Sequence, residues 1–145
     1  MRFDVENQVC SAQAFTGAAT VSTNSYKKQS AAQDISIGRR MAFLISPTVA
    51  AGAGSTSVFE VIQADDADLT SNVEAVASIS LAAAVLTVGS IHELPIPQGV
   101  LDQQFIGLRC TITGGVTTVT VDAYLVPQDE IAEYKSFPKI NHPSL

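Results

Sequence analysis

The chain has no tryptophan, only two cysteines and few charged residues, and each scarcity excludes a class of protein. Charged residues make up 15% of the 145 positions and leave a net charge of −6. A general binder of nucleic acid or of an anionic membrane needs a basic surface, so we expect neither partner. The apolar content of 46% is too high for a disordered chain and suits one domain with its own core.

Long hydrophobic runs are also missing. The longest, residues 79–88, is interrupted by Ser80 and Thr87 and falls short of the roughly 20 residues that a transmembrane helix needs. The first residues lack the apolar segment of a signal peptide, so we expect the chain to stay in the cytoplasm where it is made. In that reducing compartment we expect Cys10 and Cys110 to be free, partly buried thiols rather than a disulfide.

Catalytic and metal-binding patterns are scarce too. His92 and His142 are the only histidines. His92 precedes Glu93 in a predicted strand, so the two side chains point to opposite faces and cannot form one acid–base site. The acidic cluster at 65–68 lacks the glycine and the distal glutamate of a calcium loop, which favours a solvated turn. We therefore predict no catalytic residue, no metal site, no cofactor and no enzymatic activity.

What the chain does have is a series of short β-branched stretches separated by glycine, proline, asparagine and aspartate. We predict strands in residues 39–45 (ended by Pro47), 57–62, 85–96, 105–113 and 116–126, and favour strand over helix for the ambiguous residues 69–86. Gly114 and Gly115 predict a tight hairpin between the last two strands, because both glycines tolerate positive φ. The glycine-rich residues 52–55 predict a second hairpin tip.

The predicted strands alternate between polar and apolar residues. The inward face of residues 105–113 comprises Ile106, Leu108, Cys110 and Ile112, and that of the last strand comprises Val119, Val121, Ala123 and Leu125. Five to eight strands of this kind predict an all-β fold, an antiparallel β-sandwich resembling a jelly roll. We assign residues 1–126 to this domain, including a mostly extended N-terminal segment over residues 1–33.

Residues 127–145 are predicted to form a C-terminal arm. Pro127 and the acidic residues Asp129 and Glu130 suit the first turn of a short helix, which Pro138 would end. Both ends of the chain carry apolar side chains in segments without a core of their own, namely Phe3, Val5, Tyr134, Phe137 and Ile140. These five residues are candidate interface residues, although the ends could equally fold back onto their own sandwich.

A string of short motifs resembles the small capsid cement (decoration) proteins of tailed bacteriophages, of the Bordetella phage type. The motifs are, in order, residues 11–16 and 22–24, residues 34–38, residues 61–68, the Leu-Pro-Ile-Pro-Gln-Gly turn at 94–99 with residues 105–112, and residues 119–126. The resemblance covers roughly residues 7–130, and the tail from Pro127 departs from it.

This resemblance implies a jelly-roll-like sandwich that binds the outside of an assembled phage capsid. The implied partner is the major capsid protein, and the implied state is a homo-oligomer, either a dimer or a trimer, that bridges capsid subunits of the virion. Assembly would take place in the cytoplasm of the bacterial host. Two alternatives stay open: another virion component, such as a tail or head-completion protein, and a carbohydrate-binding module. The absence of tryptophan weighs against the second.

Overall fold

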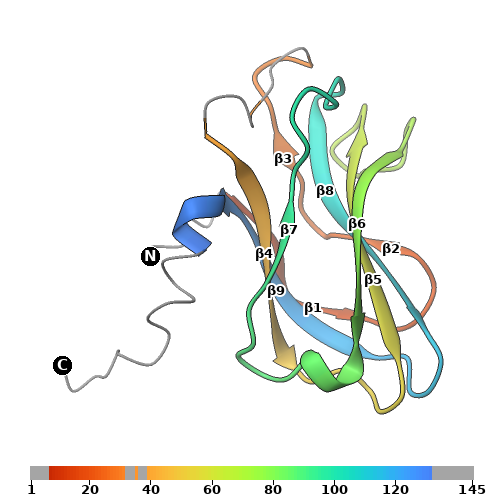
Figure 1. Cartoon of the computed structure of the whole chain (residues 1–145). Helices are drawn as coiled ribbons and strands as arrows, with labels where there is room; N and C mark the ends of the chain where they lie inside the picture. Colours follow the sequence, from red (N-terminus) through yellow and green to blue (C-terminus); the bar gives the residue numbers. More distant parts are fainter. Residues whose placement is uncertain (1–6, 32–34, 36–38, 132–145) are drawn as a thin grey trace.

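The computed structural model describes residues 7–31, 35 and 39–131, and within them nine strands form two antiparallel sheets (Figure 1). The strands are β1 Gln8–Phe15, β2 Thr20–Val21, β3 Tyr26–Lys27, β4 Met41–Val49, β5 Thr56–Ala64, β6 Glu74–Ala82, β7 His92–Pro95, β8 Phe105–Thr113 and β9 Val119–Pro127. The predicted all-β class with antiparallel sheets is thus confirmed.

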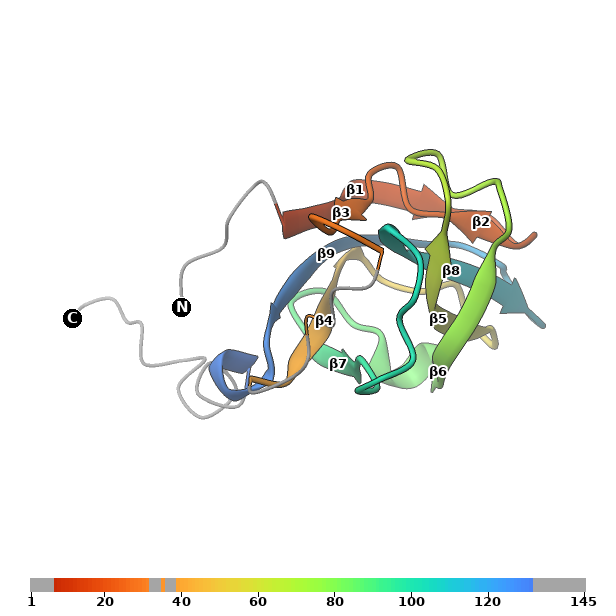
Figure 2. The ribbon, with the colours of Figure 1, turned by 90° about the horizontal axis from the view of Figure 1, so that it is seen from above.

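The two sheets face each other across one core (Figure 2). One sheet has the order β1-β9-β4-β7, and the other has the order β2-β8-β5-β6 with β3 also paired to β8. The main core cluster draws side chains from both, including Phe15 and Phe43 from the first sheet and Phe59 from the second. Phe15 and Phe59 meet edge to face with their ring centroids 6.3 Å apart. This arrangement is that of a β-sandwich.

The predicted inward faces of the last two long strands are confirmed. All four inward residues of β8 and all four of β9 are buried and belong to the main core cluster. The strand favoured for the ambiguous region is also present as β6, followed by a single 3₁₀ turn, η2, over Ala83–Val85. Within the described residues, no helix is long and apolar enough to cross a bilayer.

The predicted hairpin at Gly114 and Gly115 is wrong, although the turn is present. Both glycines have positive φ, 74° and 43°, but β8 pairs with β2, β3 and β5, whereas β9 pairs with β1 and β4. Alternation looks the same whether two strands lie beside each other in one sheet or face each other across a core. The chain crosses between the sheets at this turn, and β9 begins at Val119 rather than Val116.

The predicted hairpin tip at residues 52–55 is wrong for the same reason, since β4 and β5 belong to different sheets. Pro47 does not end its strand, because β4 continues to Val49. The Pro47 carbonyl accepts a hydrogen bond from the N–H of Gly89, so its backbone polar groups face the side of β7. β7 pairs with β4 only from Ala42 to Ile45, and no partner strand needs the N–H that proline lacks.

The N-terminal segment is more regular than predicted. Between residues 8 and 27 the chain forms β1, β2 and β3 instead of one extended stretch. β1 contains a bulge between Cys10 and Gln13, where Ala12 has a φ of 44° and its N–H donates to Asp122 Oδ1 at 2.6 Å. A separate register shift between Gln8 and Cys10 places two consecutive residues, Val9 and Cys10, in the core and so breaks the alternation by which a strand is recognised.

Candidate functional site

Ser90 and His92 come close enough to resemble a nucleophile and its base. Ser90 Oγ lies 2.9 Å from His92 Nε2, and the same hydroxyl donates to the Thr87 carbonyl at 2.7 Å. The hydroxyl has one proton, and while it donates that proton to Thr87 it accepts from the imidazole, which is the reverse of general-base activation. We interpret the pair as a brace for the turn before β7.

The acidic cluster at 65–68 has the geometry of the predicted turn. Asp66 Oδ1 accepts hydrogen bonds from the N–H groups of Thr70 and Ser71, and its Oδ2 accepts one from the Thr70 hydroxyl. The hydroxyl bond is the main reason why the pKa of Asp66 lies below its ordinary value. In the described part of the chain, no three His, Cys, Asp or Glu side chains gather as a metal ion would need.

The two cysteines are free, as predicted, but fully rather than partly buried in the core, with Cys10 on β1 and Cys110 on β8. Burial raises the pKa of both thiols from 9.0 to about 12, and for Cys10 the neighbouring Cys110 and Asp122 add to the effect. The reactive thiolate is therefore almost absent at neutral pH, and both cysteines fill space in the core.

We expect both thiols to resist alkylation while the protein is folded. At pH 8, iodoacetamide should react at least about a hundredfold more slowly than with the urea-unfolded chain, because burial suppresses the thiolate and blocks access. The raised pKa values also make the free energy of unfolding depend on pH. Their stabilising contribution is complete below the ordinary thiol pKa of 9.0 and is lost as the pH rises towards 12, because the unfolded chain loses its thiol protons first. Equal alkylation rates in the two states, followed by mass spectrometry, would contradict this assignment.

Buried polar side chains tie the loops together at the upper end of the sandwich in Figure 1. Lys28 is fully buried, and its Nζ donates to the carbonyls of Ala31 and Leu101 at 2.8 and 3.1 Å. Gln63 is also fully buried, and it accepts hydrogen bonds from the backbone N–H groups of Asp102 and Gln103. The burial of these two residues could not be predicted from the sequence, because polar residues are rarely buried and neither lies in a recognisable motif.

One open cavity of about 240 Å³ lies beside the Pro-Ile-Pro turn that follows β7. It is lined by Arg40, Pro95, Ile96, Pro97, Gln98 and Gln128. This volume is below the roughly 300–1,000 Å³ typical of small-molecule sites. No aromatic side chain lines the cavity, so it offers no platform on which a sugar ring could stack.

The outer face of the four-stranded sheet carries a second apolar cluster. Its buried members are Ala42, Leu44, Val126 and Ile131, with Ile91 and Tyr124 packed against them. Residues 128–131 form a short helical segment that lies on this face (Figure 1), and the N–H of Gln128 donates to the Arg40 carbonyl at 2.8 Å. Because Ile131 is fully buried, the start of the predicted arm packs on the sandwich.

Both ends of the described chain are attached to this same sheet. β1 pairs with β9, Gln8 Nε2 donates to the Tyr124 hydroxyl at 3.2 Å, and residues 128–131 follow β9 directly. The described part of the chain therefore both begins and ends on the four-stranded sheet. The candidate interface residues Phe3, Val5, Tyr134, Phe137 and Ile140 all lie outside the described residues, as does His142.

A comparison with protein families relates this sandwich to a known group. The family model of Bbp16 matches residues 9–125. The chain belongs to the Bbp16 family. Bbp16 is a Bordetella phage protein family, and membership of it is consistent with a phage protein. Among proteins of curated function, none matches the chain.

The Bbp16 match coincides with the sandwich. It begins at the second residue of β1 and ends two residues before the end of β9, so it includes every strand of both sheets. Residues 128–131 and the segments beyond the described residues lie outside it. Membership of the Bbp16 family is thus carried by the two-sheet domain.

Proposed function

We propose that this protein is a capsid cement protein, which binds the outer surface of an assembled phage shell and bridges neighbouring capsid subunits. The observation that carries the proposal is the Bbp16 match, because it links the whole sandwich to a phage family. The partner would be the major capsid protein. The protein itself would act as a homo-oligomer, a dimer or a trimer, without catalysis or a cofactor.

The strand pairing supports a jelly-roll topology within this proposal. The pairs are nested along the chain: β1 with β9, β2 with β8, β4 with β7, and β5 with β6. Nested antiparallel pairs of this kind arise when one long hairpin is rolled into two facing sheets, which is how a jelly roll is built.

The stabilising effect follows from mass action. A protein that binds the closed shell but not its separate subunits stabilises the shell by about 4 kcal/mol per site when its concentration is about a thousandfold above Kd. Bridging strengthens the effect, because the second contact of a bound molecule is intramolecular. The candidate residues Phe3, Val5, Tyr134, Phe137 and Ile140 would supply such contacts from the two ends of the chain. The fourteen residues after Ile131 could reach about 45 Å when extended.

Copy number in purified virions tests the proposal directly. Quantitative mass spectrometry of the phage should find hundreds of copies per particle at a fixed ratio to the major capsid protein. Shells that lack the protein should break at lower temperature, and adding it back should restore them. A ring-like copy number of about six or twelve would instead indicate a connector or tail component and would contradict a cement role.

A truncation tests the C-terminal arm. Removing residues 132–145 should leave the unfolding temperature unchanged, because Ile131, the last described residue, stays in place in its apolar cluster. Shell binding should weaken at least about tenfold, since each apolar side chain that the arm buries contributes about 1.5–3 kcal/mol before ordering costs. The cut belongs after Ile131 and not after Val126, which would also expose that cluster. Loss of folding, or unchanged binding, would contradict the arm hypothesis.

A further inference from the structure

One end of the sandwich carries no charged side chain. It is formed by residues 16–19, 49–55, 83–91 and 114–118, which we call the uncharged end. The last three segments are the turns at the lower end of Figure 1, and the first lies alongside them, with the N–H of Ile112 donating to the Gly17 carbonyl at 2.9 Å. The chain as a whole has 22 charged residues, counted as 8 basic and 14 acidic, and none falls in these four segments.

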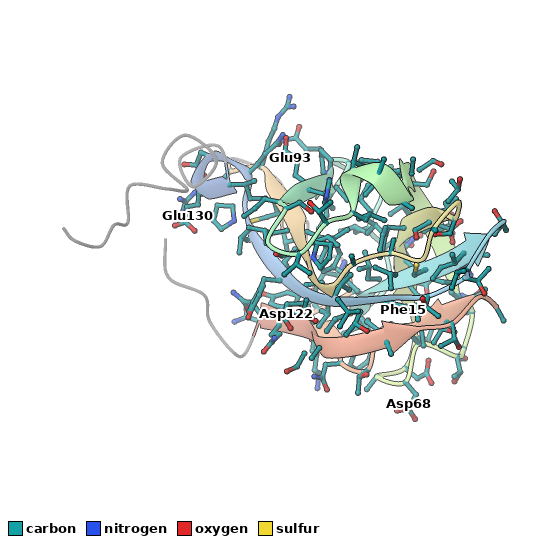
Figure 3. The ribbon with its side chains drawn as sticks, turned by 90° about the horizontal axis from the view of Figure 1, so that it is seen from below. Phe15, Asp68, Glu93, Asp122 and Glu130 are labelled. Carbon is teal, nitrogen blue, oxygen red and sulfur yellow. The ribbon has the colours of Figure 1, made fainter. Side chains whose placement is uncertain are left out.

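The same end concentrates the exposed apolar side chains. Among the described residues, five large hydrophobic side chains are exposed, and four of them are here: Val49, Val85, Val88 and Val116, with exposed fractions of 48–65%. Figure 3 views the molecule from this end, and of its four labelled acidic side chains Asp68, Glu93 and Glu130 lie around the outline, whereas Asp122 lies beside β1. The fifth exposed valine, Val100, is in the loop between β7 and β8 at the other end.

The loops of the uncharged end are fixed to one another by their backbones. The N–H of Ala51 donates to the Leu86 carbonyl, that of Gly52 to Thr118, and that of Val116 to Ala53, at 2.7–3.1 Å. The approach is so close that a Cβ atom on Gly52 would lie 2.0 Å from the carbonyl oxygen of Val116. The exposed valines lie on loops that these hydrogen bonds already hold in place. Binding at this end would therefore cost little additional conformational entropy.

We propose that the uncharged end is the surface that seats on the capsid, and that it contacts an uncharged, apolar patch of the shell protein. This inference rests on the proposed function and adds the contact surface. Depletion of charged residues distinguishes the centre of a protein interface from the rest of a surface, and clustered exposed apolar side chains mark the same kind of site. The chain has a net charge of −6, and any of its charges buried in an interface would need an oppositely charged partner on the shell. The uncharged end has no charged side chain, so it can be buried without such partners.

The location of the chain ends supports the shell as occupant rather than a second copy. The described chain begins at β1 and ends after β9, both on the four-stranded sheet, and residues 128–131 lie away from the lower turns in Figure 1. The uncharged end can therefore seat on a shell subunit without covering the points at which the described chain begins and ends. Two copies joined through this end would leave neither with an uncharged surface for the shell.

Charge-introducing variants of the full chain test the proposal on shells assembled from the major capsid protein of the same phage. Val88→Asp and Val88→Arg should each weaken co-sedimentation at least about thirtyfold, since either charge would be buried without a partner. Val116→Asp should behave in the same way. The matched control is Val100→Asp, which should bind within about twofold of wild type. Wild-type affinity should change less than about threefold between about 0.05 and 0.5 M NaCl.

Other outcomes separate the two levels of the proposal. If wild type binds shells and the Val88 variants bind equally well, the uncharged end is not the contact surface although the cement role stands. Opposite effects of Val88→Asp and Val88→Arg would reveal a charged partner surface and overturn the inference. A lowered oligomer mass of Val88→Asp in light scattering would make this end a contact between copies, which also overturns it. Failure of wild type to bind shells would remove the proposed function itself.

Discussion

Replacing Phe59 with alanine is expected to destabilise the domain by about 3–5 kcal/mol. Phe59 is fully buried on β5 between Ile79 of β6 and Cys110 of β8, and its ring meets Phe15 of the facing sheet edge to face. Truncation would remove this contact between the sheets and leave a cavity in a closely packed core. The loss would be a large part of the roughly 5–15 kcal/mol that keeps a domain folded.

Urea unfolding followed by circular dichroism measures this loss. The control is Val58→Ala on the same strand, whose side chain is half-buried on the opposite face and should cost no more than about 1 kcal/mol. If Phe59→Ala cost as little as the control, the facing of the two sheets described here would be wrong at this position.

The substitution Gln63→Glu is expected to destabilise the domain by about 3 kcal/mol or more at neutral pH. The Gln63 amide nitrogen donates to Asp102 Oδ1 at 2.9 Å and to Glu74 Oε2 at 3.1 Å. A carboxylate oxygen in its place would face two like charges from a fully buried position. Both burial and the like charges raise the pKa of the introduced carboxyl above that of the unfolded chain.

The sign of the pH dependence follows from that shift. Below the pKa of an ordinary glutamate the introduced group is protonated in both states, and its hydroxyl can donate where the amide did. Above that pKa the unfolded state ionises first, so the destabilisation grows as the pH rises towards neutral. The control is Gln63→Met, which loses the hydrogen bonds without adding charge and should be destabilised by the same amount from about pH 4 to pH 7. A constant difference between the two variants over this range would contradict the geometry.

Much of the architecture could be predicted from local patterns. Alternation along β8 and β9 identified their inward residues, because a strand with one buried face must place apolar side chains at every second position. The two-residue strands and the bulged β1 could not be predicted in this way. Their pairing is imposed by neighbours, since β2 and β3 complete the edge of β8, and Asp122 satisfies the N–H of Ala12 at the bulge.

The candidate site was harder to predict than the fold. The five interface residues proposed from the sequence lie outside the described residues and remain predictions. The uncharged end was not recognised, although its signal is in the sequence as four stretches without charge, residues 7–26, 41–59, 75–91 and 110–121. Each stretch by itself predicts only a strand and the turn next to it. Nothing local indicates that the four turns meet.

Composition and a two-residue hydrophobic period were enough to establish the strand content and the acidic, charge-poor character of the chain. Only the tertiary structure decided which strands are neighbours. Gly114 and Gly115 permit a turn in either arrangement, but pairing is chosen by the burial of whole sheet faces, and here β8 and β9 lie in different sheets and bury their inward faces in one core cluster. This pairing of the strands is nested along the chain, and it places the four uncharged turns at one end of the sandwich.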